Sequence, residues 1–109
     1  MSDIKSVVSE ALAEAQRASK EMYNKIGGDQ YACGFAWVEV FVDRTNSKVA
    51  KELIAAGFKK DHKPKCLSMW TPGGLGVQNI DIKEAGADAM AQVLRDKLGL
   101  SAYAGSRLD

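Results

Sequence analysis

A single carboxylate stands in the middle of the most apolar run of this sequence. Residues 33–43 read CGFAWVEVFVD, in which Glu39 lies two positions from both Trp37 and Phe41. Because successive side chains of a strand point to opposite faces, these three side chains would share one face. A carboxylate in an aromatic cleft can bind a cation or transfer a proton. The run therefore indicates a ligand-binding surface built from Trp37, Glu39 and Phe41, with Trp70 and Arg107 near it.

A structural interpretation of Glu39 stays open beside the functional one. An unpaired charge in an apolar setting is costly, so either this face is only partly covered or Glu39 forms an ion pair with a basic group such as Arg107, Lys65 or Arg95. In the functional interpretation Glu39 is the acid or base of a small enzyme that acts on a small ligand. Arg107 or Lys65 would then hold an anionic part of that ligand.

A second set of residues could contact phosphates. The segment KKDHKPK (59–65), which we expect to be a loop, contains four lysines, and residues 44–65 carry seven basic groups against Glu52 and Asp61, a net charge of +5. Clustered cations are what a nucleic-acid backbone requires. The aromatic, glycine-rich strand signature of RNA-recognition modules is absent, since Trp70 is the only aromatic residue in 66–71. A nucleic acid is therefore the least favoured partner, and its candidate contacts are Lys59, Lys60, Lys63 and Lys65.

The thiols and the imidazole make a weak set. His62 and Cys66 have a spacing that metal ligands can use, and Cys33 is the other cysteine of the chain. Zinc sites need four ligands, and a Cys–His nucleophile needs a third group that orients it. We therefore expect no metal and no cofactor. The glycine-rich segment TPGGLGVQN (71–79) matches no phosphate-binding motif and is typical of a turn.

The elements that must position these residues follow from periodicity. Residues 3–26 have a helical apolar stripe that is rich in alanine and ends at Gly27-Gly28. This helix would lie on a sheet or join a second copy of the chain. Residues 34–43 form a strand that is apolar on both faces and hence central. A helix follows, capped by Thr45 or Asn46 and ended by Gly57.

The second half of the chain adds a strand at 65–71 and a short strand at 75–80. The sequence DIKE (81–84) then reads as a capping box, in which Asp81 caps a helix that continues to Leu98. A final strand spans 101–106. This order predicts a single α+β domain over residues 1–109, a ferredoxin-like β-α-β-β-α-β sheet with an extra N-terminal helix. If residues 75–80 are a loop, the alternative is a three-stranded α/β sandwich.

Three runs resemble segments of small uncharacterised proteins encoded by bacteriophages. They are YACGFAWVEV (31–40), QNIDIKEAG (78–86) and YAGSRLD (103–109), which contain the shorter motifs CGFAWV, DIKEAG and AGSRLD. The resemblance implies a phage or marine-microbe source and a setting in the host cytoplasm, but no activity or cofactor. The positions that it singles out are Cys33, Trp37, Gln78, Asp81, Lys83 and Arg107.

Composition narrows the class of protein. Apolar residues make up 46% and charged residues 27% of the 109 residues, which is typical of a globular domain. The net charge of +1 indicates no strong overall attraction to nucleic acid or to an acidic membrane. We expect a cytoplasmic, non-enzymatic binding or interaction module that does not contact a membrane. Its partner would be a small ligand, another protein or, in a homodimer, a second copy of the chain.

Overall fold

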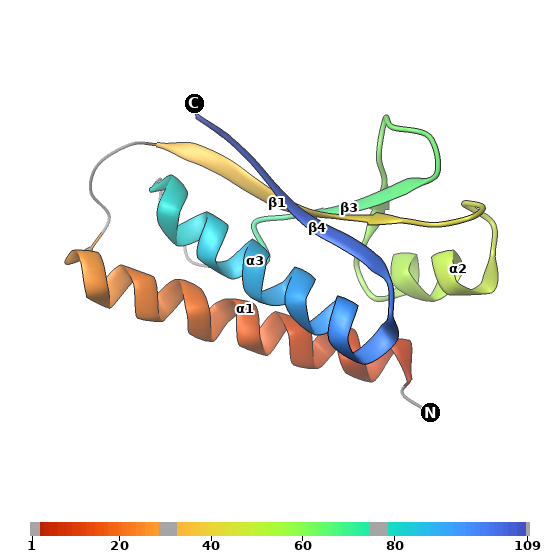
Figure 1. Ribbon diagram of the computed structural model, residues 1–109, viewed down its shortest axis with the longest axis horizontal. Coiled ribbons are helices and arrows are strands. Elements are labelled where there is room, and N and C mark those ends of the chain that lie inside the picture. The colour runs from red at the N-terminus through yellow and green to blue at the C-terminus, as the bar shows by residue number, and fades with distance from the viewer. Residues whose placement is uncertain (1–2, 29–32, 75–78, 109) are drawn as a thin grey trace.

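The computed structural model describes residues 3–28, 33–74 and 79–108, which fold as an α+β structure (Figure 1). The described residues form three helices and a four-stranded antiparallel sheet. In chain order the elements are α1 (Ile4–Ile26), β1 (Gly34–Phe41), α2 (Lys48–Ala55), β2 (Lys59–Lys60), β3 (Cys66–Trp70), α3 (Ile80–Leu98) and β4 (Ser101–Leu108).

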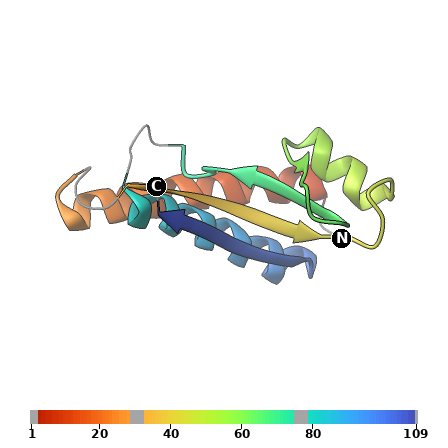
Figure 2. The ribbon, with the colours of Figure 1, turned by 90° about the horizontal axis from the view of Figure 1, so that it is seen from above.

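The sheet has the strand order β2-β3-β1-β4, so β1 is central, as its apolar sequence predicts. The register places Glu39 of β1 between Ser68 of β3 and Tyr103 of β4. The two edges of the sheet differ in length, because β4 has eight residues and β2 has only two. Figure 2 shows the long strands β1 and β4 side by side.

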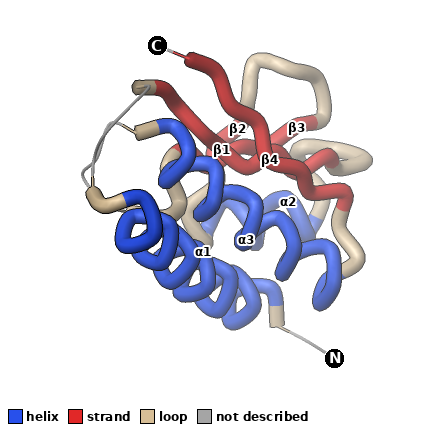
Figure 3. The backbone as a smooth tube through the Cα atoms, turned by 60° about the vertical axis from the view of Figure 1, so that its left-hand side comes forward, coloured by secondary structure: helices blue, strands red, loops and turns tan. Residues whose placement is uncertain are grey.

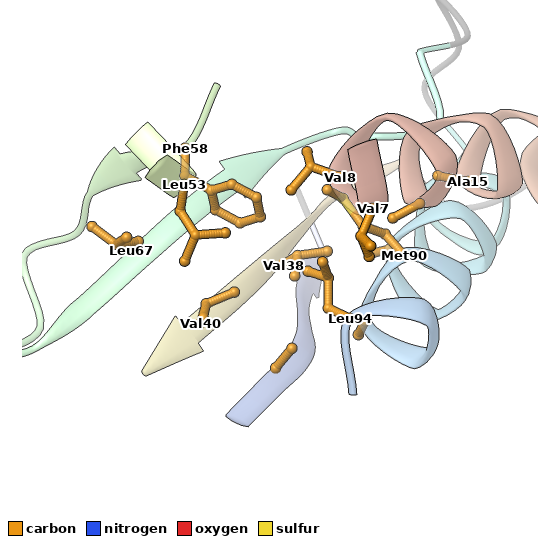
Figure 4. Packing of buried hydrophobic residues seen from close by; sticks show 14 of the residues in the cluster. Val7, Val8, Ala15, Val38, Val40, Leu53, Phe58, Leu67, Met90 and Leu94 are labelled. Atoms are coloured by element: carbon orange, nitrogen blue, oxygen red, sulfur yellow. The ribbon is translucent and has the colours of Figure 1, made fainter. Parts of the chain in front are cut away.

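All three helices lie on one side of the sheet (Figure 3). The core fills the space between the two layers (Figure 4). Val38 and Val40 of β1 point into it, and Met90 and Leu94 of α3 meet them from the helical side. At the other end of the core, the largest buried side chains are Leu53, Phe58 and Leu67. None of the helices in the described part of the chain is long and apolar enough to cross a membrane.

The first helix spans nearly the residues that its periodicity predicts, from the N-cap Asp3 to the left-handed C-cap Gly27. Its stripe of small residues packs along α3, and the two helices run in opposite directions (Figure 1). Ser19 is buried in this contact, and its Oγ donates a hydrogen bond to the carbonyl oxygen of Ile82 at 2.8 Å. The stripe is therefore covered within its own chain, and a homodimer through α1 is not needed to bury it.

Both predicted caps are wrong by one or two residues. Ser47, and neither Thr45 nor Asn46, caps α2 by accepting from the amide of Ala50. Asn79, and not Asp81, caps α3 by accepting from the amide of Ile82. A cap must directly precede the first helical residue. Because α2 begins at Lys48 and α3 begins at Ile80, the capping residues are Ser47 and Asn79. Asp81 lies instead in the first turn of α3, where its negative charge interacts favourably with the helix dipole.

Three of the four strands of the sheet, β1, β3 and β4, match strands that the sequence predicts, and the fourth, β2, does not. Residues 75–78 of the predicted strand 75–80 lie outside the described residues, while Asn79 forms an isolated bridge with Cys33 and Ile80 begins α3. The fourth strand is β2, within the segment 59–65 that was expected to be a loop. The three-stranded alternative is therefore wrong. A two-residue strand is too short to show the alternation by which strands are recognised.

Candidate functional site: the open face of the sheet

None of the described helices covers one face of the sheet, which we call the open face. Three large aromatic side chains are exposed there: Trp70 at 50%, Tyr103 at 52% and Phe41 at 40% of their surface. The strand register and the alternation of side chains define the set of strand residues on this face. Its members are Phe35, Trp37, Glu39 and Phe41 of β1, Lys59 of β2, Cys66, Ser68 and Trp70 of β3, and Ser101, Tyr103, Gly105 and Arg107 of β4.

The first aromatic platform of the open face is a pair of stacked indoles. Trp37 and Trp70 are cross-strand neighbours whose ring centroids lie 4.7 Å apart at an interplanar angle of 25°. Phe35 meets Trp70 edge-on, with 6.1 Å between the centroids. The indole of Trp37 also lies against Gly105, where a Cβ atom would come within 2.6 Å of Cε2. Gly105 therefore leaves the room that Trp37 occupies.

The second platform lies further along β1. The rings of Phe41 and Tyr103 are 6.3 Å apart and tilted by 55°. Glu39 lies between the two platforms, because it separates Trp37 from Phe41 along the strand and is opposite Tyr103. The open face thus presents two aromatic surfaces on either side of one carboxylate.

The carboxylate of Glu39 is held from two sides. Its Oε1 accepts hydrogen bonds from Nε1 of Trp37 at 3.0 Å and from Nζ of Lys63 at 2.7 Å. The Glu39 side chain is 12% exposed, whereas that of Lys63 is 46% exposed. The hydrogen bond to Glu39 is the main reason why the pKa of Lys63 is raised above its ordinary value. One oxygen of Glu39 therefore has a structural role.

The other oxygen of Glu39 remains available. Among the described residues Oε2 has no hydrogen-bond partner, and no buried side-chain oxygen or nitrogen atom in them lacks one. Oε2 must then reach solvent. It is an acceptor on a side chain that lies between the two aromatic platforms.

The ion-pair partner of Glu39 is not among the three that the sequence suggested. Arg107 lies opposite Phe35 in the sheet, with its guanidinium 5.4 Å from the centre of that ring. Arg95 donates from Nη1 to the carbonyl oxygen of Ala102 at 2.8 Å. Lys63 reaches Glu39 instead of Lys65 because the chain between β2 and β3 turns back over the sheet, a path that sequence spacing does not reveal.

The lysines of the segment 59–65 are all exposed, but they do not act as one group. Lys59 is on the open face, opposite Ser68, and Lys63 extends over that face to Glu39. Lys60, the next residue of β2, is opposite Leu67 and so belongs to the face of the sheet that carries the helices. Together with Trp70, Lys59 and Lys60 line a hollow of about 480 Å³ beside the first platform. Lys65 has a left-handed backbone conformation, with φ of 55°.

The thiols and the imidazole do not form a reactive centre. Cys66 is buried, and burial, followed by the charge of Asp61, raises the pKa of its thiol to about 11. A thiol in this environment stays protonated and is a poor nucleophile. His62 is exposed beside Asp61, while Cys33 is exposed at the bridge to Asn79. The described residues contain no group of three side chains that could hold a metal ion.

Sequence reasoning missed Ser68, Ser101, Tyr103 and Gly105 of the open face. Tyr103 and Gly105 come from the run SAYAGSRL, whose alternation with Arg107 indicates a shared face. Their relation to Glu39 and Trp37 depends on the register of β1 with β4, which the sequence alone does not show. Of the other positions that the phage resemblance singled out, Gln78 lies outside the described residues. Lys83 is buried and donates from Nζ to the carbonyl oxygen of Gly34 at 2.8 Å.

Comparison with protein-family models, with curated proteins and with solved structures finds no match to this chain. The function must therefore be argued from the geometry of the open face itself.

Proposed function

We propose that this protein is a non-enzymatic binding module whose working surface is the open face of the sheet. The observation that carries the proposal is the exposure of Trp70, Tyr103 and Phe41 together on a face that no described helix covers. Several large aromatic side chains exposed together on one face are typical of a binding site. Aromatic side chains are also the residues that contribute most to binding interfaces.

The platforms are held in place before any ligand arrives. Trp37 is fixed by its stacking on Trp70, by the space above Gly105 and by its hydrogen bond to Glu39. A binding surface that is already ordered loses less conformational entropy when a partner binds. The contacts of Trp37 therefore serve to present Trp70, the more exposed of the two rings.

We also propose that the sheet is a ferredoxin-like arrangement to which α1 is added. After α1 the elements follow in the order β-α-β-β-α-β, and the strand order β2-β3-β1-β4 keeps the first strand next to both the third and the last. In such sheets the helices cover one face and leave the other to bind partners. This topology supports the assignment of the open face as the working surface.

The two tryptophans make the proposal directly testable, because the chain has only two and both lie on the open face. A set of small planar heteroaromatic compounds would be screened by tryptophan fluorescence and by backbone amide NMR shifts. We expect the perturbed amides to cluster in β1, β3 and β4. Trp70→Ala should abolish binding, whereas Tyr23→Ala, which removes an exposed ring of α1, should leave it unchanged. Perturbations that cluster on the helices, or no binding at all, would contradict the proposal.

A further inference from the structure

We infer that the partner of the open face is single-stranded nucleic acid, with bases stacked on the two aromatic platforms and phosphates held by the cations around them. This inference rests on the proposed function of the open face. Three independent features support it: the spacing of the platforms, the sign of the charges beside them, and the free acceptor between them.

The platforms are far enough apart for two bases of one strand that have another nucleotide between them. Trp37 and Phe41 are four residues apart on β1, or about 13 Å along an extended strand. Each platform exposes a ring, Trp70 on one side and Tyr103 with Phe41 on the other. Antiparallel sheets that bind RNA stack about two or three bases on aromatic side chains of this kind. A duplex keeps its bases paired and stacked, and so cannot offer them to a flat surface.

The charges of the open face match a phosphate backbone. Lys59, Lys63 and Arg107 reach this face from three different segments, and the hollow beside Trp70 adds Lys60 at its rim. Opposing them are two carboxylates: that of Glu39, which pairs with Lys63, and that of Asp61, which lines the same hollow as Lys59 and Lys60. The cations thus lie around the platforms while the central carboxylate repels phosphate from the middle. The three cations on this face outnumber the two carboxylates, so charge favours an anionic partner over a second copy of the chain.

The free oxygen of Glu39 gives the site a preference among bases. Among the described residues no donor bonds to Oε2, and Glu39 lies between the two places where bases would stack. A carboxylate accepts well from the exocyclic amino group of cytosine. Uracil and thymine have no amino group. The open face should therefore bind oligocytidine more tightly than oligouridine.

The sequence disfavours a nucleic acid because residues 66–71 lack the aromatic signature of RNA-recognition modules. In the structure the rings of the open face come from β1, β3 and β4 together, and β3 contributes only Trp70. The earlier expectation thus depended on a pattern that this sheet does not need.

The test is a titration of the whole protein with single strands of about ten nucleotides, oligocytidine and oligouridine as RNA and as DNA, followed by tryptophan fluorescence. We expect saturable quenching and a preference of about tenfold for oligocytidine. Three phosphate contacts at about 0.7 each predict a slope of roughly −2 for the logarithm of affinity against the logarithm of salt concentration, measured between about 50 and 200 mM.

Variants separate the three features. Trp70→Ala should weaken binding by about 5- to 100-fold through the loss of one stacking surface, with Tyr23→Ala as its control.

The double change Lys59→Gln and Lys63→Gln should reduce the slope of the logarithm of affinity against the logarithm of salt concentration to roughly −0.7. Lys48→Gln with Lys51→Gln, which removes two exposed cations from α2, is the matched control and should leave the slope unchanged. Glu39→Gln should reduce the preference for oligocytidine. Circular dichroism confirms that each variant is folded.

Three outcomes would overturn the inference. Duplex DNA or inorganic polyphosphate that binds as tightly as the single strands would show attraction between charges without stacking. A dimer that forms at micromolar concentration and buries both tryptophans would show that a second copy is the occupant. Finally, planar compounds that bind the open face while no oligonucleotide does would reject this partner and leave the proposed function standing.

Discussion

The two sides of β1 use side chains of opposite size. On the side that faces the helices, Ala36, Val38 and Val40 are completely buried. On the open side, the same strand carries Phe35, Trp37 and Phe41, the last of which is substantially exposed. Burial alone would place the largest apolar side chains inside, because they gain the most from leaving water. This inversion is what the proposed binding surface requires, since it leaves large rings available to a partner.

Small residues on the helical side allow close packing of the backbone. Along the contact of α1 with α3, a Cβ atom added at Gly86 would come within 2.9 Å of Cα of Gly73 and would also collide with Ser19. Gly86 lets α3 approach Ser19 of α1 this closely, and Gly73 lets the turn at residues 71–74 pack against the same two helices. The buried side of the molecule is therefore tightly packed by small residues, while the open side presents rigid large ones.

The sharpest test of this comparison replaces the same residue type on each side. Phe58→Ala removes a buried ring from the core and should lower the free energy of unfolding by about 3–5 kcal/mol. Phe41→Ala removes a ring that is 40% exposed and should cost less than about 1.5 kcal/mol. Denaturant unfolding of both variants measures the difference. Equal losses would mean that Phe41 is covered in solution, which contradicts an open face.

A smaller effect is expected at alkaline pH from Cys66, whose thiol pKa is raised from 9.0 to about 11 in the folded chain. Between these two values the unfolded chain has lost the thiol proton while the folded chain retains it, so the stability falls as the pH rises and levels off above pH 11. The loss due to this group should reach roughly 1–3 kcal/mol. Unfolding measured from pH 8 upward in wild type and in Cys66→Ala checks this, because the variant lacks that component.

Cys33→Ala is the matched control for the alkaline experiment, since Cys33 is exposed and its substitution should leave the pH dependence intact. If Cys66→Ala and wild type lose stability in parallel, the thiol is not protected by the fold. A thiol reagent gives a second measure, and Cys33 should react much faster than Cys66 at neutral pH.

The smallest effect on stability is expected from Glu39→Gln. Glutamine can still accept the hydrogen bond from Trp37, and the half-exposed Lys63 can turn to solvent when its partner loses charge. Pairs that are open to solvent contribute little, unlike fully buried pairs. The change in unfolding free energy should be a small fraction of that for Phe58→Ala. A loss as large as that of Phe58→Ala would show that the pair is buried, and would remove the argument that Oε2 is free.

The sequence predicts the elements that have a periodic apolar pattern, and it misses those that depend on pairing between strands. Helical spacing in residues 3–26 and the apolar run in 34–43 identify α1 and the central strand within about two residues at each end. Trp37, Glu39 and Phe41 share a face by alternation alone. The short strand β2 has no periodicity, and its place in the sheet follows from its contact with β3.

The ion pair of Glu39 and the contribution of Tyr103 to the site could not be predicted for the same reason. Both depend on which residues of separate segments become neighbours, and that is decided by register and by the path of the 61–65 turn. Local spacing contains no such information. The sequence could thus place the aromatic residues on a surface, but not show that rings from three strands meet there.

The unequal edges of the sheet limit how copies of this protein could associate. The outer edge of β4 offers eight residues of backbone, whereas β2 offers two at the opposite edge. If two copies paired through β4, the continuous sheet that results would end on both sides in β2. An edge of two residues is too short to template another strand, so growth would terminate at two chains and could not propagate into a fibre.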